Sequence, residues 1–117
     1  MMKRLAACLL ALCLAGPAFA QTVAQTTNSS AVIAAGNTFQ TVLAAITSTN
    51  QRRSLSIQNN NATDSCWLFV GAGAATKGTA ILLLAGGSYT RYYPYVPSDA
   101  IQATCASTSD TLYVDFQ

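Results

Sequence analysis

Few side chains in this sequence could do chemistry, and their types limit the reactions that are available. The chain of 117 residues contains no histidine and no glutamate. It therefore lacks the imidazole that Ser-His-Asp and Cys-His catalysis use near neutral pH, and that many zinc sites use as a ligand. Two aspartates acting as a glycosidase pair, or a serine paired with Lys77, remain conceivable, but neither has a supporting motif. We predict that the protein is not an enzyme and holds no cofactor or metal ion.

A short run of tyrosine and arginine is the strongest candidate for binding. Tyr89, Arg91, Tyr93 and Tyr95 alternate along a strand-like path, so a regular strand would place them on one face and Tyr92 on the other. Tyrosine and arginine are enriched at protein interfaces because they combine large contact area with a polar tip. The same tyrosines could stack on sugar rings or cap the open end of a small core. All three interpretations remain open at the level of the sequence.

The N-terminal segment has the pattern of a signal peptide. Lys3 and Arg4 form a basic head, residues 5–16 form an apolar run, and Ala18-Phe19-Ala20 is a small-x-small cleavage site. The apolar run is shorter than the roughly 20 residues of a membrane-spanning helix. We therefore expect residues 1–20 to be removed and the mature protein to be periplasmic or extracellular, or carried on a virion surface, without a membrane span.

Cys66 and Cys105 are the two cysteines that follow this leader. An even number of thiols in a small exported domain predicts a structural disulfide. The C-x-x-C spacing of a redox pair is absent, and two buried free thiols are the other alternative. Alternation along the chain places Cys66 on one face with Leu68, and Cys105 on one face with Ala103. Both sulfur atoms should therefore point into the same core.

Charges in the mature domain are few and balanced, because the excess of positive charge lies in the leader. Nucleic-acid binding needs clustered cations that neutralise several phosphates. Here the only cluster is the Arg52-Arg53 pair, so we predict that the protein does not bind nucleic acid. The charged side chains after residue 20 are Arg52, Arg53, Lys77 and Arg91, with Asp64, Asp99, Asp110 and Asp115.

Two loops contain residues that are typical of ligand sites but fit a structural role better. Residues 59–64, Asn-Asn-Asn-Ala-Thr-Asp, offer several oxygen atoms that could hold calcium. Their spacing matches no EF-hand, and asparagine amides in turns commonly bond their own backbone. Residues 71–75 are rich in glycine but lack the Gly-Lys-Ser/Thr end of a phosphate loop. We interpret both as turns, with Lys77 in a solvated turn just after the second.

The apolar pattern predicts an all-β fold, namely a small antiparallel β-sandwich or jelly-roll-like barrel of about seven strands in residues 36–117. Residues 21–35 have little to bury and are expected to form a flexible or partner-docked arm. Gly86-Gly87 and residues 106–110 are expected to close hairpins, and Leu112, Val114 and Phe116 to face the core. The expected strands are residues 38–47, 54–58, 66–70, 80–84, 88–93, 101–105 and 111–116.

Four segments share motifs with one family. They are Arg53-Ser54-Leu55-Ser56-Ile57-Gln58-Asn59-Asn60, Cys66-Trp67-Leu68-Phe69-Val70-Gly71, Leu83-Leu84-Ala85-Gly86-Gly87-Ser88-Tyr89 and Val96-Pro97-Ser98-Asp99-Ala100-Ile101. Over roughly residues 50–117 the chain resembles small β-sandwich proteins of tailed bacteriophages and prophages, with a signal peptide added.

The resemblance implies a non-enzymatic virion component, such as a head-decoration or tail-associated protein. Such a component would dock on protein partners, by self-assembly or on a virion lattice, through strand edges and its N-terminal arm. A secreted or periplasmic binding protein of the bacterial envelope, with carbohydrate as one possible ligand, is the alternative.

Overall fold

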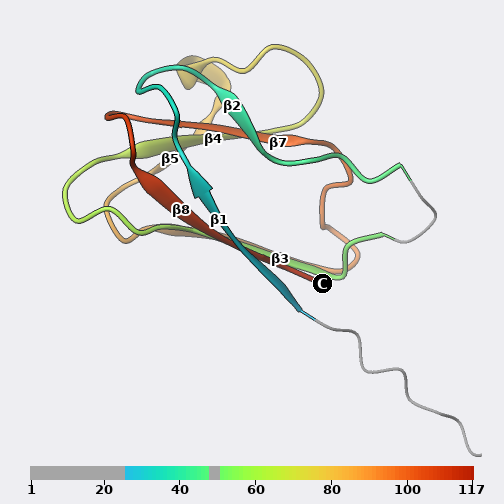
Figure 1. Ribbon diagram of the computed structural model, residues 1–117. Coiled ribbons are helices and arrows are strands. Elements are labelled where there is room, and N and C mark those ends of the chain that lie inside the picture. Colours follow the sequence, from blue (N-terminus) through green and yellow to red (C-terminus); the bar gives the residue numbers. More distant parts are fainter. Residues whose placement is uncertain (1–25, 48–50) are drawn as a thin grey trace, which may run out of the picture.

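The structure is a computed structural model that describes residues 26–47 and 51–117. The expected signal peptide, and residues 21–25 of the expected arm, lie outside the described residues. The described elements (Figure 1) are β1 Thr27–Val32, β2 Gln40–Leu43, β3 Ser54–Asn59, β4 Cys66–Val70, the 3-10 helix η1 Lys77–Thr79, β5 Ile81–Leu83, β6 Ser88–Tyr92, β7 Ile101–Cys105 and β8 Thr111–Phe116.

The strands form two four-stranded antiparallel sheets, sheet 1 with the order β1-β8-β3-β6 and sheet 2 with the order β2-β7-β4-β5. Strands from the two halves of the chain pair with each other: β1 with β8, β2 with β7, β3 with β6 and β4 with β5. The chain therefore resembles one long hairpin whose tip lies between β4 and β5. Successive strand pairs along this hairpin belong alternately to sheet 1 and sheet 2. This is the jelly-roll arrangement. The expected fold class is confirmed, with eight strands described where about seven were expected.

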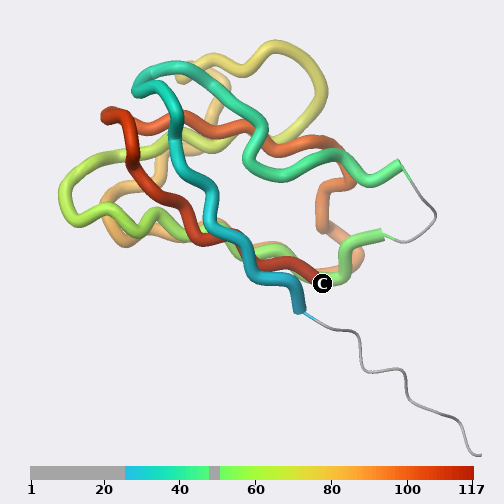
Figure 2. Tube along the Cα trace, in the orientation of Figure 1, coloured from blue at the N-terminus to red at the C-terminus, as the bar shows by residue number. Residues whose placement is uncertain are grey.

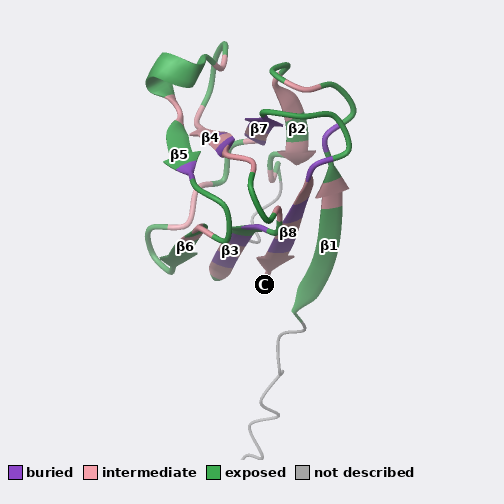
Figure 3. Ribbon diagram, turned by 90° about the vertical axis from the view of Figure 1, so that its left-hand side faces the viewer, coloured by how far each residue is buried: buried purple, intermediate pink, exposed green. Residues whose placement is uncertain are grey.

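Apolar side chains from both sheets form one buried cluster between them. Figure 3 marks buried residues on strands of both layers, such as β7 and β8. The alternation expected for β3 and β8 is present, because Leu55, Ile57, Leu112 and Val114 are fully buried. Phe116 is half-buried and packs against the same core. The buried apolar residues are Ile33, Leu55, Ile57, Cys66, Leu68, Leu83, Ile101, Ala103, Cys105, Leu112 and Val114.

Strand β4 is apolar on both faces because the loop after it covers its outer side. Trp67 alternates with the buried Cys66 and Leu68 and so faces away from the core. The Nζ atom of Lys77 lies 3.8 Å from the centre of the Trp67 ring and donates a hydrogen bond of 2.6 Å to Oδ1 of Asn37. Lys77, expected in a solvated turn, is exposed but fastens this loop onto sheet 2.

Strand β1 corrects the expectation of a flexible or partner-docked arm for the described part of that segment, which begins at residue 26. Thr27–Val32 pairs with β8 at six consecutive positions without a register shift. The segment shows no apolar alternation because it lies at a sheet edge, where its Thr, Asn and Ser side chains stay exposed (Figure 3). Backbone pairing, which the side-chain pattern does not record, holds it in place.

Both expected hairpins are wrong. The Gly86-Gly87 turn connects β5 to β6, and residues 106–110 connect β7 to β8, but each pair of strands lies in two different sheets. The tube in Figure 2 can be followed through the second connection from one layer to the other. The glycine turn does reverse the chain, since Gly87 N–H donates to Leu84 O at 2.8 Å. Turn residues identify a reversal, whereas the pairing partner is chosen by contacts far away in the sequence.

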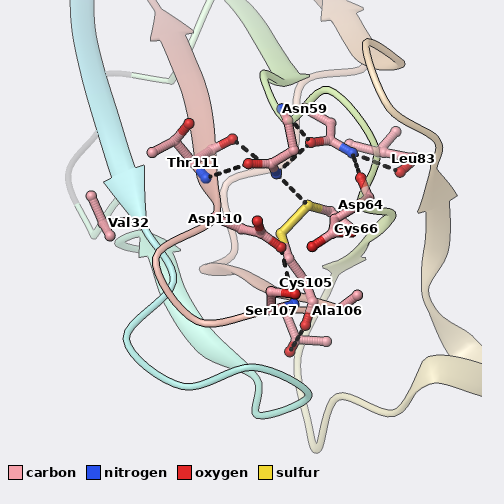
Figure 4. Close-up of a disulfide and its surroundings, with 12 residues drawn as sticks. Val32, Asn59, Asp64, Cys66, Leu83, Cys105, Ala106, Ser107, Asp110 and Thr111 are labelled. Atoms are coloured by element: carbon pink, nitrogen blue, oxygen red, sulfur yellow. Dashed lines mark hydrogen bonds between the residues drawn. A yellow bond between two sulfur atoms is a disulfide. The ribbon is translucent and has the colours of Figure 1, made fainter.

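The predicted disulfide between Cys66 and Cys105 is confirmed (Figure 4). The two residues lie directly opposite each other on the neighbouring strands β4 and β7, and both are fully buried in the core. Leu68 and Ala103 are also opposite each other and buried, as the expected register requires. The bridge therefore ties the two central strands of sheet 2 together.

Removing the bridge should destabilise the domain strongly. The cysteines are separated by 39 positions, and a loop of that length corresponds to about 4 kcal/mol in the chain-entropy model. We expect the double variant Cys66→Ala/Cys105→Ala to lose that order of unfolding free energy in urea titrations. Reductant should lower the stability of the wild type but not of the variant. Equal midpoints for the oxidised and fully reduced wild type would contradict a stabilising bridge.

Candidate binding surface on strand β6

Strand β6 lies at the edge of sheet 1 and pairs only with β3. Tyr89 is opposite Ile57 and Arg91 is opposite Leu55, and both of these partners face the core. Directly opposite residues in an antiparallel pair share a face, so Tyr89 and Arg91 lie on the core side of the sheet. Tyr89 is half-buried and packs against the core, whereas Arg91 is exposed.

Arg91 is held in place by Tyr89. Its Nε atom donates a hydrogen bond of 3.1 Å to the Tyr89 hydroxyl, and its guanidinium carbon lies 4.9 Å from the centre of the Tyr89 ring. Within the described part of the chain, Arg91 forms no ion pair with a carboxylate. The stacked guanidinium thus retains free N–H groups, which suit a carboxylate or a carbonyl of a ligand.

The chain turns immediately after β6, so Tyr93 and Tyr95 do not continue the alternation that the sequence suggests. Tyr95 N–H donates to Tyr92 O at 3.0 Å, and the Tyr93-Pro94 peptide bond is cis. Tyr93 N–H donates to Arg53 O at 2.8 Å, which fixes the turn to the start of β3. The one-face arrangement therefore holds for Tyr89 and Arg91 only.

Three tyrosines around this turn are largely exposed: Tyr92 at 69%, Tyr93 at 66% and Tyr95 at 80%. They do not cap the core, so that interpretation applies to Tyr89 alone. Together with neighbouring residues they line an open pocket of about 440 Å³. We call this the β6 surface, and its residues are Thr90, Arg91, Tyr92, Tyr93 and Tyr95.

The β6 surface includes two residues that the sequence did not point to. Tyr92 lies on the face opposite to Arg91, as expected, and Thr90 shares that face, yet both line the pocket. The turn at Tyr92–Tyr95 places Tyr93 and Tyr95 at the same pocket, and Pro94 was the one signal in the sequence that the strand would end there. The surface offers aromatic ring faces, hydroxyl groups and one cation, which can bind a ligand.

The Arg52-Arg53 pair does not form a basic patch, because Arg52 is only 3% exposed. Its Nη1 donates to the carbonyl oxygens of Pro97 at 2.6 Å and Asp99 at 3.2 Å, and its Nη2 donates to the carbonyl of Ala44. Burial lowers the pKa of Arg52, while the charge of Asp99 acts in the opposite direction. The group stays protonated because the ordinary pKa of arginine is far above neutral. Arg52 is therefore a structural tie between loops.

The asparagine segment begins at Asn59, the last residue of β3, and its amides are used within the protein. Asn59 is fully buried, and its Nδ2 donates to the carbonyl oxygens of Asp64 at 2.8 Å and of Leu83 at 3.1 Å. Its Oδ1 accepts from Nδ2 of Asn61 at 2.7 Å, and Oδ1 of Asn61 accepts from Thr111 N–H at 3.0 Å. Figure 4 shows this network beside the disulfide. The amide oxygens of Asn59 and Asn61 thus bond other groups of the protein, as is typical of a turn.

Comparisons with known proteins add no family or relative. No protein-family model, no curated protein and no solved structure matches the chain. Across residues 26–47 and 51–117, no helix has the length and apolar character needed to cross a membrane. In the same described ranges, no three His, Cys, Asp or Glu side chains come together as they would to hold a metal ion.

The role of Arg52 predicts that lysine substitutions at Arg52 and at the adjacent Arg53 change the unfolding free energy by different amounts. Arg52→Lys should lower the unfolding free energy by about 1–3 kcal/mol, because an ammonium group cannot satisfy the same set of buried carbonyls. The matched control Arg53→Lys changes an exposed side chain and should stay within about 0.5 kcal/mol of the wild type. Urea titration of both variants measures the difference, and equal effects would contradict the assigned role.

Proposed function

We propose that the mature protein is a non-enzymatic, exported structural and binding module of the virion-surface or assembly type, and that it docks a protein partner through the β6 surface. One observation carries this proposal: three tyrosines that are 66–80% exposed line the same pocket as Arg91, which forms no ion pair among the described residues. Exposed aromatic side chains and arginine are the residues that most often dominate binding energy at protein interfaces.

Several properties of the chain support the same proposal. The domain lacks histidine and glutamate, which removes the commonest catalytic bases. The leader pattern and the disulfide agree with an oxidising compartment outside the cytosol. The resemblance to small phage β-sandwich proteins suggests that the partner belongs to a particle, and the jelly-roll arrangement is one that capsid domains use.

Carbohydrate binding is the second candidate, because the β6 surface is a shallow, open hollow with aromatic rings in its lining. A pocket of about 440 Å³ falls within the range of small-ligand sites. Tyrosine rings offer apolar faces to the CH groups of a sugar, and their hydroxyls and Arg91 offer hydrogen bonds to its oxygen atoms. This role would suit a secreted or periplasmic binding protein.

The double variant Tyr93→Ala/Tyr95→Ala should lose partner binding while keeping its fold. Cosedimentation with particles from the natural source measures docking, and we expect at least about a 30-fold loss of affinity from two central aromatic contacts. Tyr113→Ala, on β8 and outside the β6 surface, is the control and should bind normally. Circular dichroism checks the fold of both variants.

The outcomes separate the two candidates. Wild-type protein found only free in the periplasm, with no binding to particles, would contradict the virion-type role. Glycan-array binding by the wild type that disappears in the double variant would favour the carbohydrate role. Mass spectrometry of the natural protein adds whether it begins at Gln21.

A further inference from the structure

The two sheets of the sandwich have four edge strands, which differ in how well they are protected against pairing with a further strand. Strand β5 has 3 residues, and β2 has 4 with a register shift. Strand β6 has 5 residues, includes a charged arginine and ends in the crowded tyrosine turn. Strand β1 is the longest at 6 residues, has no charge and no proline, and pairs with β8 without a shift. Short length, charge, proline and bulges are the devices that block edge pairing, and β1 has none of them.

The free backbone groups of β1 belong to alternate residues. Ile33 N–H donates to Asp110 O at 2.8 Å, so Ile33 is directed toward the β8 side. Alternation then directs Ser29 toward β8 and Asn28 and Ser30 outward. The carbonyl of Val32 fits this pattern, because it points outward and accepts from Nε2 of Gln40 at 2.7 Å.

Asn28 and Ser30 thus leave their backbone N–H and C=O groups without a partner among the described residues. Both lie in the exposed stretch of β1 (Figure 3). Unpaired backbone groups along an extended strand form a template onto which another strand can add.

We propose that β1 pairs with β1 of a second copy of this chain in antiparallel orientation about a two-fold axis. Asn28 would lie opposite Ser30 of the second copy, so the outward N–H and C=O groups of both residues are satisfied in both copies. Ser29 would lie opposite itself on the axis. This pairing joins sheet 1 of each copy into one continuous sheet. The proposed β1 pairing does not involve the β6 surface, so it can be tested separately from the proposed docking function.

The properties of β1 favour a second copy of this chain as the partner at its free edge. Two-fold antiparallel pairing is self-complementary, so one sequence fills both sides of the contact. The strand carries no charge that would repel its copy or select an oppositely charged partner. Its side chains are small, Thr-Asn-Ser-Ser-Ala-Val, so two edges can approach to the distance of a normal strand pair.

The test compares the same substitution on the two edges of sheet 1. Ser30→Pro removes an outward N–H and leaves the bonds to β8 intact, whereas Ser88→Pro does the same on β6. We expect the naturally processed wild type and Ser88→Pro to be dimers in analytical ultracentrifugation. Ser30→Pro should weaken the dimer by about tenfold or more, because a donor is lost on each side of the axis. Ser30→Lys keeps the backbone N–H group and serves as the second variant in case proline disturbs folding. It should weaken the dimer as well, because a charged side chain on an edge strand disfavours pairing.

Cross-linking tests the register. Ser29→Cys should form a covalent dimer on oxidation, because opposing residues at a non-hydrogen-bonded position of an antiparallel pair lie close enough for a disulfide. Ser88→Cys and the wild type should not form one. A wild type that stays monomeric at all concentrations would overturn the proposal. So would a dimer that survives both Ser30 substitutions, or one that Ser29→Cys does not link.

Discussion

The buried amide of Asn59 is the contact on which the relation between the two sheets depends. Its Nδ2 atom donates to the carbonyl oxygens of Leu83 and Leu84, both at 3.1 Å, where the chain leaves β5. Its backbone N–H donates to Gly87 O at 2.9 Å, and its backbone carbonyl accepts from Gly86 N–H at 3.0 Å. One residue at the end of β3 therefore fixes the whole turn that carries the chain from sheet 2 to sheet 1. Because a buried amide without partners is costly, this network favours a single path for the crossing.

That path decides where the β6 surface lies. After the crossing, β6 pairs beside β3, which places Tyr89 over the core and Arg91 on the Tyr89 ring. The turn that follows is then fixed by the bond from Tyr93 N–H to the backbone of Arg53 at the start of β3. The start of β6 is thus attached to the end of β3, and the end of β6 is attached to the start of β3. The β6 surface is therefore positioned by contacts with β3 and its flanking residues, which are not part of that surface.

The sequence predicted the strands in the middle of the sheets and the edge strands β2, β5 and β6, and it failed at the edge strand β1 and at the crossings between the sheets. A half-buried strand such as β3 or β8 alternates visibly, and the cysteines share that alternation, so burial, register and the disulfide could be inferred together. Strand β1 has no such pattern because nothing in Thr27–Ser30 is buried. The glycine turn at Gly86 was recognised as a reversal, but its pairing depends on Asn59, 27 positions earlier.

The same distinction applies to the candidate site. Tyrosine and arginine composition was enough to select residues 89–95 as candidates, because protein interfaces are enriched in these residue types. Their arrangement was not predictable, because regular alternation ends at Tyr92 where the chain bonds back to itself. The Arg52-Arg53 pair could not be resolved from sequence either. Only the fold shows that Arg52 reaches carbonyls from two other loops while Arg53 stays exposed.

The two proposed surfaces have a geometrical consequence when they are taken together. Strands β1 and β6 are the opposite edges of sheet 1. Pairing through β1 would therefore leave the β6 surfaces at the two far ends of one continuous sheet, available to two partner sites at once. A module of this kind gains affinity for a repetitive surface through effective concentration, even where each contact is weak. Under these two proposals, a small domain would bind a repetitive partner surface firmly even though each single contact is small.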